Sequence, residues 1–160
     1  MDDWGDFNLA LVGATAALAG LVIVAASVNI AEIVKAPALT ARLGTAISSL
    51  VLALVVSALG LAPGLDTVVY GAVAVLASLV AATFAVDAAR RITADRSPLN
   101  RLRGLKSALG FLVPAAYAVG GILMVPGSVA AGTAAFAFGA LLSIIVALMI
   151  SWIVLVEVLR

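Results

Sequence analysis

The chain has 160 residues, of which 65% are hydrophobic and only 11% are charged. Soluble globular domains use roughly 45–50% apolar and about 25% charged residues, so this composition excludes an ordinary soluble domain. The sequence has no Cys and no His, which excludes disulfides, thiolate nucleophiles and imidazole chemistry, and its formal net charge of +1 gives no excess that would favour nucleic acid as a partner.

The first apolar run covers 9–31 and follows a leader that contains Asp2, Asp3 and Asp6 but no Lys or Arg. At about 1.5 Å per residue, the run is long enough to cross roughly 30 Å of hydrocarbon. A cleaved signal peptide begins with a basic segment, so the acidic leader favours a retained transmembrane helix.

This first helix has two different faces. Small residues suited to close helix packing share one of them: Gly13, Ala17 and Gly20. Thr15 and Asn29 share the other face, and Glu32 follows one turn later. Because an unsatisfied amide in hydrocarbon is costly, Asn29 is predicted either to hydrogen-bond to a neighbouring helix or to face a water-filled path.

Two further apolar runs, 40–61 and 67–89, are separated by a Pro63-Gly64 pair. Proline and glycine end a helix and favour a tight turn. The two runs are therefore predicted to form a helical hairpin.

The longest polar segment, 90–106, follows the third run and holds most of the basic residues of the chain. These are Arg90, Arg91, Arg96, Arg101, Arg103 and Lys106. Leucines recur at every third position within it, a pattern that can lie on an anionic lipid surface with the cations at the headgroups. The segment is expected to contact anionic lipid headgroups or to dock a protein partner.

A fourth helix is predicted over 98–125, with its membrane part from about 107, since Ser97 and Pro98 form an N-cap followed by an N1 proline. A second Pro-Gly turn then leads into the last run, 130–156. The chain is thus expected to be an all-α transmembrane bundle of five helices in one domain, 1–160.

Small residues also recur at every fourth position in the second and fifth helices. The candidate packing residues there are Ser49, Ala53, Ser57, Gly139, Ser143, Ala147 and Ser151. Such rows let a neighbouring helix approach closely, either inside the bundle or on a second subunit. Pro114 in the fourth helix is a candidate kink.

Charge predicts the orientation of these five spans. All nine basic residues lie at the first and third connections or at Arg160, and the opposite face holds acidic residues only: Asp2, Asp3, Asp6 and Asp66. Lys and Arg in short loops favour the cytoplasm, so the N-terminus is expected outside and the C-terminus inside. Carboxylates at the cytoplasmic helix ends precede basic residues by three or four positions, as in Glu32 with Lys35 and Asp87 with Arg91, and these are expected to pair.

Motifs for chemistry are missing from the sequence. It contains no Walker glycine loop, no H-E-x-x-H, no G-x-S-x-G and no dinucleotide fingerprint. The membrane interior of the predicted spans contains no ionisable group except the phenols of Tyr70 and Tyr117, whereas pumps and proton relays keep a carboxylate or amine near the midplane. We expect no enzyme, no catalytic residues, no cofactor and no metal.

The segment Trp4-Gly5-Asp6-Phe7-Asn8, with VGATAALAGL at 12–21 and AASVN at 25–29, resembles small actinobacterial membrane proteins of uncharacterised function. Some of these carry the label of modulator of the membrane protease FtsH. The resemblance covers mainly the first helix and implies a multi-pass protein of the bacterial cytoplasmic membrane.

Two functions follow from this pattern. The first is a non-enzymatic scaffold or regulator that acts through helix–helix contacts with itself, as a homo-oligomer, or with another membrane protein. The alternative is a homo-oligomeric channel in which Thr15, Asn29 and Glu32 of the first helix line the path.

Overall fold

The computed structural model describes residues 4–94 and 103–158, without the side chains of 103–106, 155, 157 and 158. The described chain is all-helical and has no strand. Its helices are α1 (Gly5–Val28), α2 (Ile30–Lys35), α3 (Pro37–Leu59), α4 (Thr67–Ala94), α5 (Arg103–Met124) and α6 (Val129–Val158). All except α2 contain a stretch long and apolar enough to cross a membrane, which indicates a multi-pass membrane protein and confirms the predicted helical bundle with five candidate spans.

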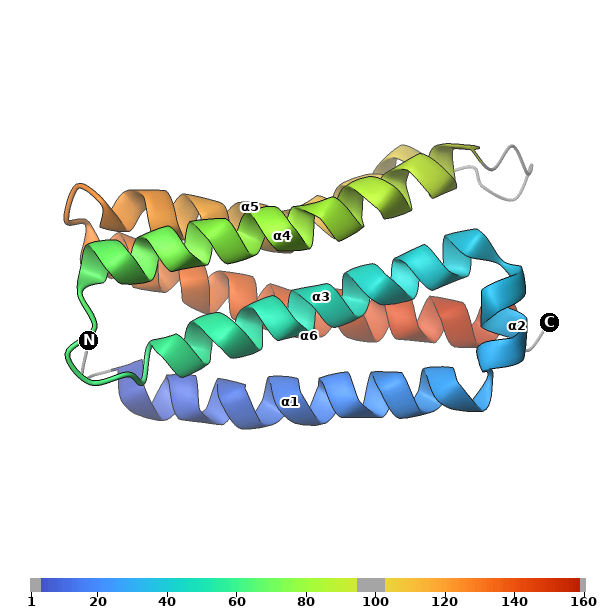
Figure 1. The fold of residues 1–160 in the computed structure, drawn as a ribbon, viewed down its shortest axis with the longest axis horizontal. Coiled ribbons are helices and arrows are strands. Elements are labelled where there is room, and N and C mark those ends of the chain that lie inside the picture. Colours follow the sequence, from blue (N-terminus) through green and yellow to red (C-terminus); the bar gives the residue numbers. More distant parts are fainter. Residues whose placement is uncertain (1–3, 95–102, 159–160) are drawn as a thin grey trace.

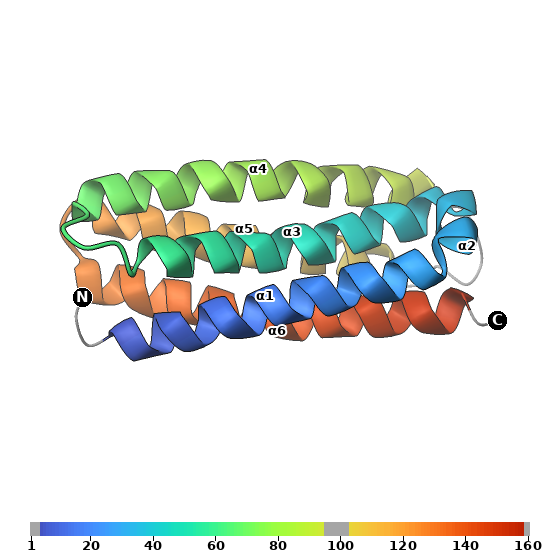
Figure 2. The same cartoon turned by 60° about the horizontal axis from the view of Figure 1, so that its bottom comes forward.

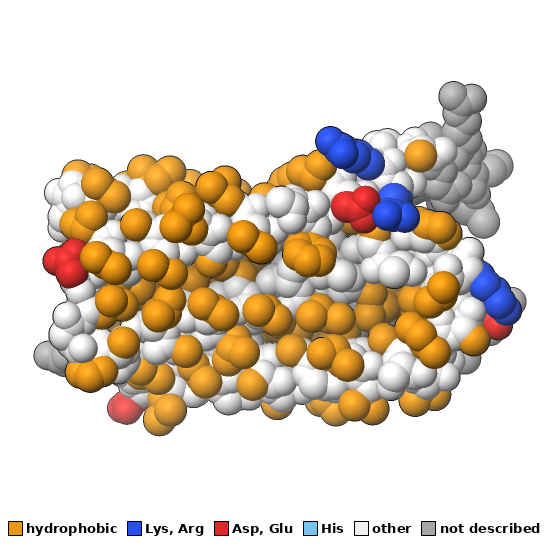
Figure 3. Space-filling model, viewed as in Figure 1, with side chains coloured by type: hydrophobic (Ala, Val, Ile, Leu, Met, Phe, Trp, Pro, Cys, Tyr) orange, Lys and Arg blue, Asp and Glu red, His pale blue; other side chains and the backbone are white. Residues whose placement is uncertain are grey.

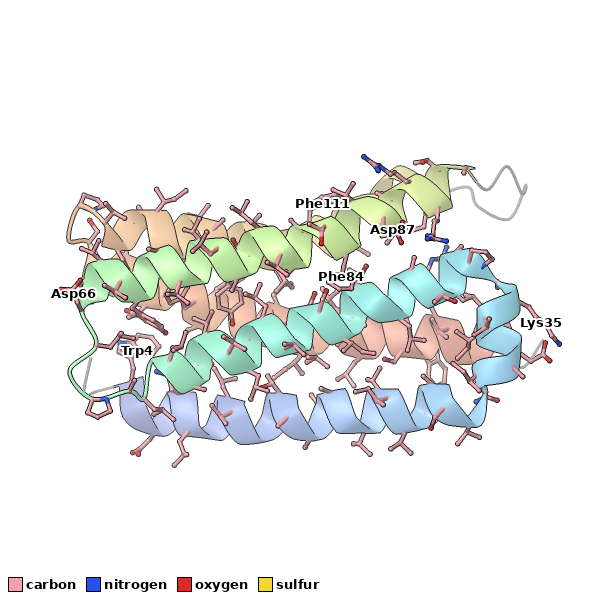
Figure 4. The ribbon with its side chains drawn as sticks, in the orientation of Figure 1. Trp4, Lys35, Asp66, Phe84, Asp87 and Phe111 are labelled. Atoms are coloured by element: carbon pink, nitrogen blue, oxygen red, sulfur yellow. The ribbon has the colours of Figure 1, made fainter. Side chains whose placement is uncertain are left out.

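The five long helices run side by side along one axis, with α3 in the middle of the bundle (Figures 1 and 2). Helix α3 packs against α1, α4 and α6, while α5 lies between α4 and α6. Helices α1 and α4 lie on opposite sides of α3 (Figure 1). One end of the bundle carries Trp4 and Asp66 and the other carries Lys35 (Figure 4). We call these the Asp66 end and the basic end.

The predicted first run is interrupted at Asn29, which separates α1 from the short helix α2. The backbone N–H of Asn29 donates to Ala26 O at 3.2 Å, and its Nδ2 donates to Ala25 O at 3.4 Å. Asn competes in this way with the regular helical ladder, so the break has a local cause. Helix α2 turns across the basic end of the bundle (Figure 1).

The second run starts earlier than predicted, at Pro37 instead of residue 40. Ala36 is extended, with φ −115° and ψ 92°, as the residue before a proline prefers. Pro37 then opens α3 at a position where its missing N–H costs nothing. The hydroxyl of Thr40 donates to Ile33 O at 2.9 Å and ties α2 to the start of α3.

Both predicted Pro-Gly turns lie where the long helices reverse at the Asp66 end. Gly64 and Gly127 have φ values of +70° and +88°, which only glycine adopts easily. Asp66 caps the next helix, because its Oδ1 accepts the backbone N–H groups of Val68 and Val69 at 2.9 and 3.2 Å. Helix α4 continues to Ala94, five residues past its predicted end, and the predicted N-cap Ser97 with Pro98 lies outside the described residues.

Candidate functional surfaces

Helix α1 turns its two faces in opposite directions. Leu11, Thr15, Ala19 and Val22 are buried against the bundle. On the opposite face, Gly13, Ala17 and Gly20 are exposed. A Cβ atom added to Gly13 or Gly20 would meet nothing within 4 Å. The small face of α1 therefore points away from its own bundle.

The three candidate pore residues lie in different surroundings. Thr15 is fully buried and its hydroxyl donates to Leu11 O at 2.6 Å. Asn29 is half-buried and lines a pocket of about 30 Å³ between α1, α2, α3 and α6. Neither Thr15 nor Glu32 lines this pocket. Glu32 is exposed on α2 and pairs with Lys35 at 2.7 Å. The structure does not bring these three side chains into one lined path.

The small-residue rows of α3 and α6 lie inside the bundle. The buried members are Ser49, Ala53, Ser57, Gly139, Ser143 and Ala147. The hydroxyl of Ser49 donates to Thr45 O at 2.9 Å and that of Ser143 to Ala140 O at 2.7 Å, so each is satisfied on its own helix. Ser151, half-buried at the basic end, has a buried Oγ without a hydrogen-bond partner in the described structure.

Glycines outside the predicted packing rows allow two close helix contacts. A Cβ on Gly121 would lie 2.5 Å from Gly71 O, and one on Gly71 would lie 2.7 Å from Gly121 O. Gly120 and Gly132 approach in the same way across α5 and α6. The sequence signal for these contacts is the adjacent pair Gly120-Gly121, because two neighbouring glycines on one helix allow a different helix to approach on each side.

An aromatic cluster near the Asp66 end was also missed. The rings of Tyr70 and Tyr117 lie 5.3 and 5.5 Å from the ring of Phe136. The hydroxyl of Tyr70 donates to Val56 O at 3.0 Å, whereas that of Tyr117 is buried with no partner among the described residues. Pro114, the candidate kink, is buried within the continuous helix α5.

Two of the predicted ion pairs are confirmed. Lys35 Nζ lies 2.7 Å from Glu32 Oε1, and Arg91 Nε lies 2.8 Å from Asp87 Oδ2. Arg90 is exposed. Of the other basic residues predicted to contact headgroups, Arg96 and Arg101 lie outside the described residues, and only the backbone of Arg103 and Lys106 is described.

A surface groove runs between α3 and α4. Its larger section has a volume of about 600 Å³ and is almost wholly apolar, with Gly44, Val55 and Phe84 among its walls. A second section of about 400 Å³ shares Gly44 and Phe84 and adds Asp87 and Arg91. Hydrophobic side chains cover this face, while Lys and Arg appear only toward its basic end (Figure 3).

In 4–94 and 103–158, no group of three or more His, Cys, Asp or Glu could hold a metal ion. No family model, curated protein or solved structure matches the chain.

Proposed function

We propose that this protein is a non-enzymatic membrane scaffold or regulator that binds a transmembrane helix through the outer face of α1. The bound helix belongs to a second copy of the chain or to another membrane protein. The observation that carries this proposal is the exposed face formed by Gly13, Ala17 and Gly20, which has open space where side chains would otherwise stand.

In a lipid bilayer, small residues on an exposed helix face favour the binding of another helix. Lipid tails are as apolar as Leu, so burial of apolar surface does not drive helices together in a bilayer. Close backbone approach does, and it requires small residues at the contact. Larger exposed side chains, including Leu21 and Val24, stand beside the small residues and would form the walls of the interface.

The proposed orientation places the basic end in the cytoplasm of a bacterium, with the N-terminus outside and the C-terminus inside. Supporting this, the side chains of Lys35, Arg90 and Arg91 belong to the basic end, while Asp6 and Asp66 belong to the other. Arg90 and the rest of the 90–106 segment would then meet anionic headgroups. A regulatory role beside a membrane protease fits the resemblance of the first helix.

The channel alternative has less support. A pore lined by α1 in a ring of subunits would need the polar face of α1 to point outward from each bundle. Thr15 points inward, is fully buried and bonds to its own helix. The face available to a neighbour carries glycine and alanine instead.

Cysteine cross-linking in native membranes tests the α1 contact, because the chain has no Cys of its own. Ala17→Cys should cross-link, either to a second copy or to another membrane protein, and Ala17→Cys combined with Gly20→Leu should cross-link much less. Ala72→Cys is the matched control, since Ala72 is exposed on α4. Equal cross-linking of Ala17→Cys and Ala72→Cys would overturn the proposal.

Orientation is tested with a thiol reagent that does not cross membranes. In intact cells it should label Asp66→Cys, and it should label Lys35→Cys only after permeabilisation. The reverse order would overturn the proposed orientation without affecting the α1 interface.

A further inference from the structure

The groove between α3 and α4 has the dimensions of one leaflet. Its apolar section reaches from Gly44 to Val55 on α3, eleven residues apart. At about 1.5 Å per residue this is roughly 16 Å, close to half of the roughly 30 Å hydrocarbon core. One acyl chain of a phospholipid occupies one leaflet, so the length of the apolar section matches a lipid chain.

The shape of the groove suits a single flexible chain. Leu52 and Ala81 are buried and form its floor, while Val80 and Phe84 are exposed and form its rim. Small residues keep the depression open, since Gly44 has only a ring carbon of Phe84 near its missing Cβ, at 3.6 Å. Phe84 projects between α3 and α4 beside Asp87 (Figure 4).

The groove ends in charged side chains on the side of the basic end. Its last section is lined by Thr40, Asp87 and Arg91, on the side of the basic end. Asp87 and Arg91 form an ion pair of 2.8 Å whose side chains are both about half exposed, at 51% and 48%. This end therefore presents one carboxylate and one guanidinium, with no net charge between them.

We propose that the α3/α4 groove binds one zwitterionic phospholipid of the phosphatidylethanolamine type. One acyl chain lies along the apolar section, the phosphate contacts Arg91, and the ammonium contacts Asp87. A guanidinium is the preferred donor to phosphate and a carboxylate the natural partner of an ammonium, so the two charges of the pair match the two charges of this headgroup. An acidic headgroup such as phosphatidylglycerol would leave its phosphate beside Asp87 with no ammonium to offset the repulsion.

This site differs from the anionic lipid contact proposed for the 90–106 segment, which depends on excess positive charge and needs no groove. It also lies on the opposite side of α3 from the α1 interface (Figure 1). The lipid proposal shares with the proposed function the membrane-spanning bundle and Arg91, which lies at the start of the 90–106 segment.

Native mass spectrometry of the full chain tests the proposal after release from nanodiscs containing equal amounts of phosphatidylethanolamine and phosphatidylglycerol. We expect one retained phosphatidylethanolamine per chain. Arg91→Gln and Asp87→Asn should each lower this retention about tenfold, as expected for the loss of one charge-assisted contact. Arg90→Gln is the matched control, because it removes the same charge from the same helix without touching the groove, and it should change nothing.

The apolar section is tested with Gly44→Leu, whose side chain would occupy the groove and should abolish retention. Helicity and thermal stability show whether that variant folds, and the two charge variants, which change exposed side chains, carry the test if it does not. Equal retention of both lipids, or an equal loss in Arg90→Gln and Arg91→Gln, would overturn the proposal.

A protein helix cross-linked to Val80→Cys in native membranes would also overturn the lipid proposal. Cross-linking at Ala17→Cys is independent of the groove and should persist in the Gly44→Leu variant. The two proposals can therefore fail separately.

Discussion

Glycines form both a close helix contact inside the bundle and an open face on its outside. Between α4 and α5, Gly71 and Gly121 bring two backbones so close that a Cβ on either would collide with the carbonyl oxygen of the other. On α1, Gly13 and Gly20 face outward, and a Cβ added to either would meet nothing within 4 Å. Glycines thus allow close packing between α4 and α5, whereas those on the outer face of α1 have no packing partner in the described structure.

The difference comes from what lies opposite each glycine. Small residues permit close packing, and a neighbour is needed to use it. Inside the bundle α5 supplies that neighbour for α4, whereas α1 packs on α3 with its other face. Substitution of single glycines should separate the two cases.

The largest effect is expected for Gly121→Ala. The new Cβ would lie 2.5 Å from Gly71 O, so α4 and α5 must move apart. Such overpacking costs about 1–3 kcal/mol of unfolding free energy. Reversible unfolding in mixed detergent measures it, and a variant as stable as the original chain would contradict the close contact.

A smaller effect is expected for Tyr70→Phe, at the residue next to Gly71. This change removes the buried hydrogen bond to Val56 O and should cost about 0.6–1.5 kcal/mol. Tyr117→Phe is the matched control, because the Tyr117 hydroxyl is buried without a partner in the described structure, and it should be neutral or stabilising. A larger loss in Tyr117→Phe than in Tyr70→Phe would contradict this assignment.

A substitution on the exposed small face of α1 should not lower the unfolding free energy. Gly20→Ala adds a methyl group to free space and removes backbone entropy from the unfolded chain, so it should leave stability unchanged or raise it by up to about 1 kcal/mol. The same unfolding assay compares it with Gly121→Ala. A destabilisation of similar size in both variants would remove the distinction between the two faces.

The smallest effect is expected at the basic end. Arg91→Gln breaks an exposed i,i+4 ion pair and should lower the unfolding free energy by only about 0.3–0.5 kcal/mol. Added salt should reduce the difference between the two proteins. A loss above about 1 kcal/mol, or one that salt leaves unchanged, would mean that Arg91 stabilises the bundle through more than this pair.

The long spans and their turns were predictable because each depends on residues close together in the sequence. Apolar length, the Pro63-Gly64 turn and the pairing of Glu32 with Lys35 are local properties. The break at Asn29 was not predicted, since hydropathy continues through it and its cause is an Asn side chain that donates to the backbone of the preceding turn, at Ala25 O.

The candidate surfaces were predictable only in part. Periodicity separated the two faces of α1, but whether Gly13 or Thr15 points inward depends on where α3 packs. The contact of Gly71 with Gly121 joins positions fifty residues apart. Neither helix sequence alone determines how α4 and α5 align along their length. The α3/α4 groove likewise needs the relative placement of two helices.

The two glycine turns also bear on how the protein enters a membrane. Seven residues, 60–66, join α3 to α4, and four, 125–128, join α5 to α6. Within these two connections Asp66 is the only charged residue, and it already accepts two backbone N–H groups of α4. Each hairpin can therefore insert as a unit with its backbone polar groups largely satisfied and little charge to carry across the hydrocarbon. Helix α1 packs on α3 with its buried face, so its small face stays accessible to another chain in the bilayer.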